Sequence, residues 1–203
     1  MKLSRKSTTI LVVAIVVVIL LIDQAMKVYV KLNFSLGAAF PVFSWFHICF
    51  VENDGMAFGI EWFDKLFLTL FRVVAIGLVS WFVHSLIKSG ARTAFIVLVA
   101  LVLAGAIGNL IDCMFYGVLF SESTPFDVAV FMPEGGGYAP FLYGKVVDML
   151  YFPLITNAAG ETLFFRPVFN FADSCITASV IVIILFFSKD LNKSLSKDKT
   201  KKS

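Results

Sequence analysis

Charged residues are scarce in this chain, and several motifs that mark common enzyme classes are missing. Asp, Glu, Lys and Arg make up 15% of the 203 residues, whereas a soluble domain has about 25%. The net charge of +3 is too small for a nucleic-acid-binding surface. The sequence contains no P-loop, no GxGxxG and no HExxH. These absences exclude an ordinary cytosolic enzyme, a disordered chain and a nucleic-acid binder.

Cysteine and histidine are too few and too scattered for a metal or redox centre. Cys49, Cys113 and Cys175 are widely spaced and form no CxxC, which argues against a disulfide framework, a zinc site or a thiol-redox site. His47 and His84 are single and far apart. We therefore predict no metal and no cofactor.

Apolar residues, in contrast, are abundant and are grouped in long runs. They make up 59% of the chain, and 23 residues are Phe. A helix that crosses a bilayer needs about 20 mostly apolar residues. Four stretches meet or nearly meet this length, at about 8–32, 66–87, 93–114 and 172–188. The sequence therefore predicts an all-α membrane protein with four transmembrane helices.

The first apolar run has some features of a secretory signal peptide. Three basic residues precede the 13-residue run Ile10–Ile22. Asp23 and Lys27 follow it, and no small-residue cleavage site lies at the proper place. We therefore expect a retained first helix rather than a cleaved signal.

The basic residues predict the orientation in the membrane. Eleven of the 17 Lys and Arg lie before the first run, between the second and third, and after the fourth. The positive-inside rule makes that side cytoplasmic, so both termini are cytoplasmic, including a tail at 189–203 that we expect to be solvated and disordered. The longer segments 33–65 and 115–171 then lie on the opposite side. There, the runs 144–152 and 162–171 predict a small β-containing subdomain of one membrane-embedded domain, 1–203.

Polar residues inside a membrane are costly, so each one is a candidate for a functional site. A rise of about 1.5 Å per residue brings the polar groups of all four helices into one layer, the third of the membrane farthest from the cytoplasm. This layer contains Asp23, Lys27, Asn109, Asp112, Asp173 and the start of the second helix after Asn53-Asp54-Gly55.

Some of these residues have structural alternatives. Asp23 and Lys27 are spaced i,i+4 and can form a buried ion pair that locks the first helix instead of taking part in chemistry. Asn109 follows Gly105 and Gly108 and can serve helix packing. Arg72 can snorkel outward or neutralise an acid.

Paired carboxylates are the remaining candidates for chemistry. Asp148 lies in the apolar frame VVDMLYF, where desolvation favours its neutral form. Asp173 lies at a helix N-terminus, where the dipole favours the carboxylate. Two Asp with opposite environments are suited to act as an acid and a base. From spacing alone, Asp112 or Asp127 competes with Asp148.

Five short blocks resemble the lipoprotein signal peptidases (signal peptidase II), which are four-helix aspartic peptidases of the bacterial inner membrane. The blocks occur in the family's order and are Asp23-Gln24-Ala25-Met26-Lys27, Asn53-Asp54-Gly55-Met56-Ala57-Phe58, Gly105-Ala106-Ile107-Gly108-Asn109-Leu110-Ile111-Asp112, Val146-Val147-Asp148 and Phe169-Asn170-Phe171-Ala172-Asp173-Ser174. Each block is weak alone, but their order and common depth make the resemblance specific.

The resemblance implies that Asp148 and Asp173 form the catalytic dyad. It implies a substrate-binding or supporting role for the other polar and glycine positions of the blocks, namely Asp23, Lys27, Asn53, Gly55, Gly108, Asn109, Asp112 and Asn170. The implied substrate is a prolipoprotein with a diacylglyceryl-modified Cys, cut on the N-terminal side of that Cys near the periplasmic membrane surface. Membrane lipid is the other implied partner, and no cofactor or oligomer is implied.

The chain departs from the family at three places, and one of them is Met149, which follows Asp148 where Phe is common. Cys113 stands where the family usually has Arg directly after Asp112, and Arg72 or Arg166 is a candidate to supply the missing cation. The stretch Phe115–Tyr143 is an insertion relative to the family's usual short connection.

An alternative function is a non-enzymatic membrane transporter or assembly factor that uses the same polar layer. A pathway needs polar groups through the whole bilayer, whereas the cytoplasmic two-thirds of each predicted helix is apolar. A thiol-redox membrane enzyme is a second alternative, and the scattered cysteines argue against it.

Overall fold

The computed structural model describes residues 3–54, 65–156, 162–164 and 167–199. Its main helices are α1 (Arg5–Asn33), α2 (Lys65–Ser89), α3 (Thr93–Ile111), α5 (Phe171–Phe186) and α6 (Ser188–Lys199). A π-helical turn, η2 (Asp112–Tyr116), and the short α4 (Gly117–Leu119) continue directly from α3. The strands are β1 (Ala39–Phe43), β2 (Phe46–Asn53), β3 (Val146–Tyr151), β4 (Ile155–Thr156) and β5 (Thr162–Phe164).

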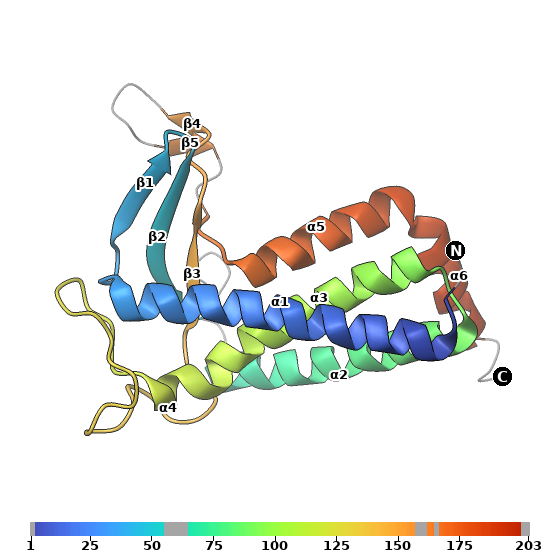
Figure 1. The fold of residues 1–203 in the computed structure, drawn as a ribbon, viewed down its shortest axis with the longest axis horizontal. Helices are drawn as coiled ribbons and strands as arrows, with labels where there is room; N and C mark the ends of the chain where they lie inside the picture. Colours follow the sequence, from blue (N-terminus) through green and yellow to red (C-terminus); the bar gives the residue numbers. More distant parts are fainter. Residues whose placement is uncertain (1–2, 55–64, 157–161, 165–166, 200–203) are drawn as a thin grey trace. The chain divides into compact units, whose positions relative to one another are not determined.

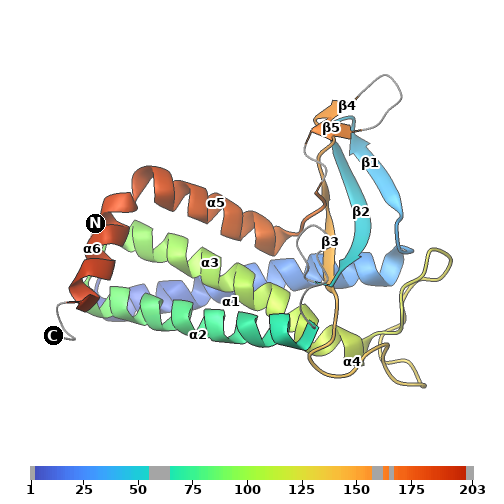
Figure 2. The same cartoon turned by 180° about the vertical axis from the view of Figure 1, so that it is seen from behind.

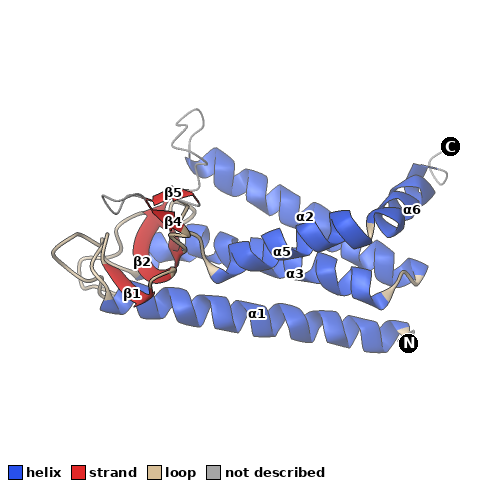
Figure 3. Ribbon diagram, turned by 90° about the horizontal axis from the view of Figure 1, so that it is seen from above, coloured by secondary structure: helices blue, strands red, loops and turns tan. Residues whose placement is uncertain are grey.

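The helices confirm the prediction of a helical membrane protein. Among the described residues, Arg5–Asn33, Lys65–Ser89 and Thr93–Leu119 are long and apolar enough to cross a bilayer. The predicted fourth helix is α5, which reaches the length of a span only together with α6, after an 85° bend (Figure 3). The chain is therefore a multi-pass membrane protein with three or four spans.

The tail at 189–203 was expected to be disordered, and this expectation is wrong for residues 189–199, which lie in α6. Leu191 packs against the apolar core, and its backbone N–H donates to the Phe187 carbonyl at 3.0 Å, in the i to i−4 pattern of a helix. Arg92 pairs with Asp190 across 3.2 Å. Lys and Leu are also good helix formers, so this largely polar segment forms a helix once Leu191 and Asp190 make these contacts.

Residue contacts divide the chain into two compact units, each with its own core. The first, which we call the apolar unit, comprises Met1–Leu21, Val73–Ile107 and Ala172–Ser203. Its core consists of aliphatic and aromatic side chains from four helices, including Val12, Leu86, Phe95, Leu103 and Ile183. Such burial is the main stabilising term available inside the unit, because dispersion contacts accumulate over many atoms.

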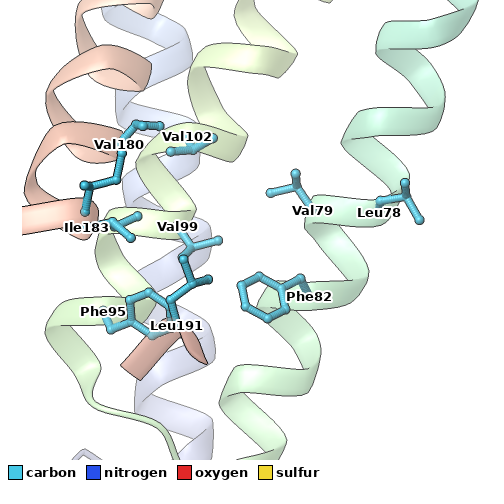
Figure 4. A pocket seen from close by; sticks show the side chains of 10 residues that line it. Leu78, Val79, Phe82, Phe95, Val99, Val102, Val180, Ile183 and Leu191 are labelled. Atoms are coloured by element: carbon cyan, nitrogen blue, oxygen red, sulfur yellow. The ribbon is translucent and has the colours of Figure 1, made fainter. Parts of the chain in front are cut away.

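The apolar unit also contains a groove of about 450 Å³ between α2, α3, α5 and α6. Figure 4 shows Val79 and Phe82 of α2 across from Val99 and Val102 of α3. All ten lining residues are apolar. None of the predicted site residues lines this groove, and it offers no side chain for acid–base chemistry.

The second unit, which we call the polar unit, comprises Ile22–Arg72 and Gly108–Phe171. It contains a three-stranded antiparallel sheet in the order β1-β2-β3 (Figures 1 and 2). The run 144–152 was correctly predicted as a strand, but its partner is β2, with Glu52 opposite Val147 and Asn53 opposite Val146. In the described part of the run 162–171, residues Thr162–Phe164 form β5, which pairs with β4, and Phe169 forms an isolated bridge with Leu150 of β3. The predicted sheet therefore exists, but with a different composition.

A second core supports this sheet. It is formed by Val30 of α1, Phe50 of β2, Tyr116 and Phe120 near α4, and Val147 and Met149 of β3. Residues far apart in sequence thus meet around the last turns of α1. Their packing fixes the strands that carry the candidate site residues.

Candidate active site

Asp148 lies in β3 with only 3% of its surface exposed. Each carboxylate oxygen accepts a hydrogen bond from a different amide: Asn53 Nδ2 donates to Oδ2 at 3.1 Å, and Asn170 Nδ2 donates to Oδ1 at 2.7 Å. Hydrogen bonds to a carboxylate stabilise its charged form and hold its orientation. The carboxyl group of Asp148 is therefore buried, oriented and bound by donors on both oxygens.

Backbone pairing explains how both amides reach Asp148. Asn53 is the last residue of β2, beside β3. On the other edge of β3, Leu150 and Phe169 exchange N–H···O bonds of 2.7 and 3.1 Å. Phe169 is followed directly by Asn170. The sheet therefore brings one amide to Asp148 from each side.

Lys27 is the centre of a buried ionic cluster. Its ammonium lies 3.0 Å from Asp23 Oδ2, 2.8 Å from Asp112 Oδ2 and 2.8 Å from Asn109 Oδ1. An ammonium has three donors, and these three acceptors use all of them. Lys27, Asp23 and Asp112 are fully buried. The i,i+4 pair predicted from the sequence is therefore present, as part of a larger cluster.

Asp112 is bound by structural partners, which distinguishes it from Asp148. Besides Lys27, it accepts hydrogen bonds from Gln24 Nε2 at 2.9 Å and from the Val147 backbone N–H at 3.3 Å. Gln24 also donates to the Gly108 carbonyl at 3.2 Å, so Gly108 takes part through its backbone. Asp127, the other competitor, lies exposed in a turn with Thr124. Among the competing carboxylates, Asp148 is thus both buried and held by neutral amides.

The two clusters are connected through a pair of asparagines. Asn109 Oδ1 accepts from Lys27 and also from Asn170 Nδ2, at 3.0 Å. Asn170 Nδ2 in turn donates to Asp148. A continuous path of hydrogen bonds therefore leads from the buried ammonium to the Asp148 carboxylate. Asn109, for which helix packing was an alternative, orients the amide that binds Asp148.

The end of α3 carries features that the sequence did not predict. The π-helical turn η2 begins at Asp112 and buries Asp112, Cys113 and Tyr116. Gly144 donates its backbone N–H to the Cys113 carbonyl at 2.8 Å, and a Cβ at Gly144 would collide with the Asp112 carbonyl oxygen. π-Helical turns occur frequently at functional sites. Here the turn and the glycine let the start of β3 approach Asp112.

Arg72 of α2 lies against Cys113, the position at which a family arginine was expected. Its Nη1 donates to Cys113 Sγ at 2.7 Å. Of the two candidates for the missing cation, Arg72 is therefore next to the substituted position. Arg166, and likewise the predicted site residue Gly55, lie outside the described residues.

Asp173 lies in the first turn of α5 and is half-buried. The N-terminus of a helix stabilises a carboxylate. The pairing of Asp173 with Asp148 remains a prediction.

Gln24 and Tyr116 were missed as site residues by the sequence analysis. Gln24 Nε2 lies 3.2 Å from Asp23 Oδ2, and Tyr116 donates its hydroxyl to Gln24 Oε1 at 3.1 Å. The rule that identified Asp23 also applies to an amide inside a membrane helix, so Gln24 was detectable. Tyr116 was not detectable, because its position depends on the π-helical turn η2. Among the described residues, no three His, Cys, Asp or Glu side chains form a group suited to a metal ion.

Two solved structures share this fold. Both are described as a bacterial membrane enzyme, and both align with a TM-score of 0.61 and 25% identity. The first alignment covers 90% of this chain and 90% of the solved chain, and the second covers 88% and 93%. The apolar helices thus define a multi-pass membrane protein with the fold of these enzymes.

Sequence comparison identifies the family. The model of the family described as signal peptidase (SPase) II matches residues 15–189. A lipoprotein signal peptidase of Porphyromonas gingivalis is 44% identical over 191 residues, with 89% of this chain and 84% of the relative covered. One of Amoebophilus asiaticus is 32% identical over 179 residues, covering 81% and 72%. The chain belongs to the signal peptidase II family and is a peptidase, which confirms the resemblance found in the five blocks.

Proposed function

We propose that this protein is an aspartic endopeptidase that removes signal peptides from diacylglyceryl-modified prolipoproteins, cutting N-terminal to the lipidated Cys. The observation that carries the proposal is the buried Asp148 carboxyl group with one amide on each oxygen. Membership of the signal peptidase II family supports the reaction, and the name of the 44% identical relative, lipoprotein signal peptidase, supports the substrate class.

Asp148 and Asp173 form the proposed catalytic dyad. Chain connectivity supports the pairing: Asn170, which binds Asp148, is separated from Asp173 by only two residues. Their surroundings also differ, since Asp148 is buried in a strand and Asp173 begins a helix. Two carboxyl groups in unlike environments are suited to divide the roles of acid and base between them.

The proposed mechanism is general acid–base hydrolysis. One carboxylate takes a proton from a water molecule, which attacks the carbonyl carbon of the scissile peptide bond. The other carboxyl group, protonated, donates a hydrogen bond to the carbonyl oxygen and later helps to protonate the leaving amine. The amides of Asn53 and Asn170 keep Asp148 oriented during these transfers. No covalent acyl-enzyme forms.

The lipid on the substrate supplies much of the proposed binding. Burial of a CH₂ group contributes about 0.8 kcal/mol, so two acyl chains in contact with apolar helices bind strongly. We place the protein in the bacterial inner membrane with both termini in the cytoplasm and the active site toward the periplasm. The support is the distribution of Lys and Arg, 11 of 17 of which fall in the three segments assigned to the cytoplasm.

A transporter is less consistent with the helices. Ile10–Ile22 and Ala94–Ala104 contain no charged or amide side chain. An ion path along α1 or α3 would lack polar groups over these stretches.

A cleavage assay in liposomes tests the proposed function. The purified protein is given a precursor with a diacylglyceryl-modified Cys and the same precursor with that Cys replaced by Ser, which cannot be lipidated. We expect cleavage of the lipidated precursor alone, with a product that begins at the modified Cys. Equal cleavage of both contradicts the proposed lipid requirement, and cleavage of neither contradicts the peptidase assignment.

A further inference from the structure

A second buried lysine, Lys31, lies one helical turn beyond Lys27 in α1 and takes no part in the proposed reaction. It is fully buried, and its ammonium is paired with the Glu52 carboxylate. Lys31 also donates to Ser123 Oγ at 2.9 Å, and that hydroxyl donates to Glu52 Oε1 at 3.0 Å. We call Lys31, Glu52 and Ser123 the Lys31 anchor.

Three aromatic rings surround the ammonium of the anchor. Its Nζ lies 5.0 Å from the ring centre of Tyr138, 5.5 Å from that of Phe120 and 5.9 Å from that of Phe50. Rings at these distances attract a cation and keep water away from it. A charge in such surroundings depends on its hydrogen-bonded partners, because burial of an unpaired charge is costly.

Glu52 and Tyr138 also hold the residue that leads into β3. Lys145 Nζ lies 3.7 Å from Glu52 Oε2, and the Lys145 backbone N–H donates to the Tyr138 hydroxyl at 2.7 Å. Burial raises the pKa of Tyr138, so its phenol is neutral over the physiological range. Phe120, Ser123 and Tyr138 all belong to the insertion at 115–143. The insertion is therefore fastened to α1 and β2 by a buried charge.

Glu52 directly precedes Asn53 in β2. Successive side chains of a strand point to opposite faces, so the carboxylate of Glu52 and the amide of Asn53 lie on opposite sides of β2. Asn53 is the residue whose amide donates to Asp148. Fixing the backbone at Glu52 therefore fixes the position of that amide.

We infer that Lys31 is a positioning residue, which acts through Glu52 to hold the Asn53 amide on Asp148, with the insertion completing its surroundings. Lys27 acts in the same way on the other amide, through Asn109 and Asn170. Two lysines on one face of α1 thus each control one of the two hydrogen bonds that Asp148 accepts. The inference rests on the proposed function, in which Asp148 is catalytic.

A double-mutant cycle between Lys31 and Asn53 tests this inference. The purified wild type, Lys31→Met, Asn53→Ala and the double variant are compared for kcat, KM and pH dependence on the lipidated precursor. We expect Lys31→Met to lower kcat about tenfold in the wild type and by less than about twofold in the Asn53→Ala background. Both single variants should move the limb of the kcat profile that reports Asp148 to higher pH, because the Asp148 carboxylate loses a donor. Lys6→Met, an exposed change in the same helix, should leave every value unchanged.

Equal losses of kcat in both backgrounds would overturn the inference. So would a Lys31→Met protein with a lower melting temperature but an unchanged kcat and pH profile, since that describes a purely structural residue. If Lys31→Met does not fold, Ser123→Ala replaces it in the same cycle with the same two criteria. An inactive wild type would contradict the proposed function instead, so the two failures are distinguishable.

Discussion

The apolar unit and the polar unit bury different kinds of side chain. Among the described residues, ten polar or charged side chains are buried, and eight of these lie in the polar unit. Thr8 and Ser179 are the two in the apolar unit. The helix α1 contributes to both units: its first part exposes Ile10, Val13 and Leu21, and its second part buries Asp23, Lys27 and Lys31. One continuous helix therefore supplies apolar surface for lipid and then charge for a site.

This difference indicates which part of the chain buries charged groups for function at the expense of stability. Apolar side chains in the first unit need only a matching shape, whereas every buried charge in the second needs its own partner. Substitutions should therefore destabilise the two units for different reasons: a poor fit of shape in the apolar unit and an unpaired buried charge in the polar unit. The predictions below test that contrast, beginning with the largest effect.

Lys27→Met should cause the largest loss of stability. It leaves Asp23 and Asp112 buried without their ammonium partner, which costs about 3–5 kcal/mol. The melting temperature in detergent or lipid should fall by about 10 °C. Lys27→Met/Asp112→Asn should recover part of the loss because one uncompensated charge is removed, and Lys6→Met serves as the exposed control. An unchanged melting temperature of Lys27→Met would contradict the role of the ionic cluster.

Asn170→Ala should lower activity more than stability. The change removes the 2.7 Å hydrogen bond to Asp148 and the link to Asn109. Hydrogen bonds to charged groups contribute about 1.5–3 kcal/mol, so kcat should fall about tenfold to a hundredfold. Asn33→Ala, which removes an exposed amide at the end of α1, is the matched control. A kcat equal to that of the wild type would argue against Asn170 as a support of the catalytic carboxylate.

Gly105→Ala should destabilise the apolar unit. A Cβ at this position would lie 2.5 Å from the Ala172 carbonyl oxygen and 2.7 Å from Ile176, so α3 and α5 would have to separate at a cost of about 1–3 kcal/mol. Gly77→Ala is the matched change, since nothing lies within 4 Å of its Cβ, and it should raise stability slightly through helix propensity. Thermal unfolding of both variants gives the comparison. Equal effects of the two would mean that close helix packing at Gly105 is not required.

Replacing all three cysteines by Ser should have the smallest effect. Burial raises the pKa of Cys49, which keeps it a thiol, and a hydroxyl at position 113 can still accept from Arg72. Activity on the lipidated precursor should remain within about twofold of the wild type, because no thiol takes part in the proposed reaction. Loss of activity would support the alternative of a thiol-redox enzyme.

Much of the fold was predictable because hydrophobic length identifies membrane helices directly. The rule that intramembrane polar groups are candidates for a functional site also singled out Asp23, Lys27, Asn109 and Asp112, which the structure brings together. The strands β1 and β2 were not predicted, since the aromatic and Pro-containing run at 39–53 has no clean alternation. The pairing of β2 with β3 joins segments about a hundred residues apart, and no local pattern encodes such a register.

Parts of the site depend on such long-range contacts. The path from Lys27 through Asn109 and Asn170 to Asp148 joins α1, α3, the segment before α5 and β3. The resemblance identified its members, but their order along the path follows from the side-chain geometry. The rule for polar groups in membrane helices also applies to Lys31, which lies in the predicted helix 8–32. Its pairing with Glu52 and Ser123 had no sequence signal, because Glu52 lies beside a recognised block and Ser123 lies in the insertion.

The central claim is that two carboxyl groups, Asp148 and Asp173, carry out the hydrolysis. Its most direct test is cleavage of the lipidated precursor by purified Asp148→Asn and Asp173→Asn, with Asp127→Asn as an exposed control. Asn keeps the size of Asp but cannot take up the proton of the attacking water. We expect both dyad variants to fold like the wild type and to give no cleaved product, while Asp127→Asn remains fully active. Retained cleavage by either dyad variant would contradict the assignment.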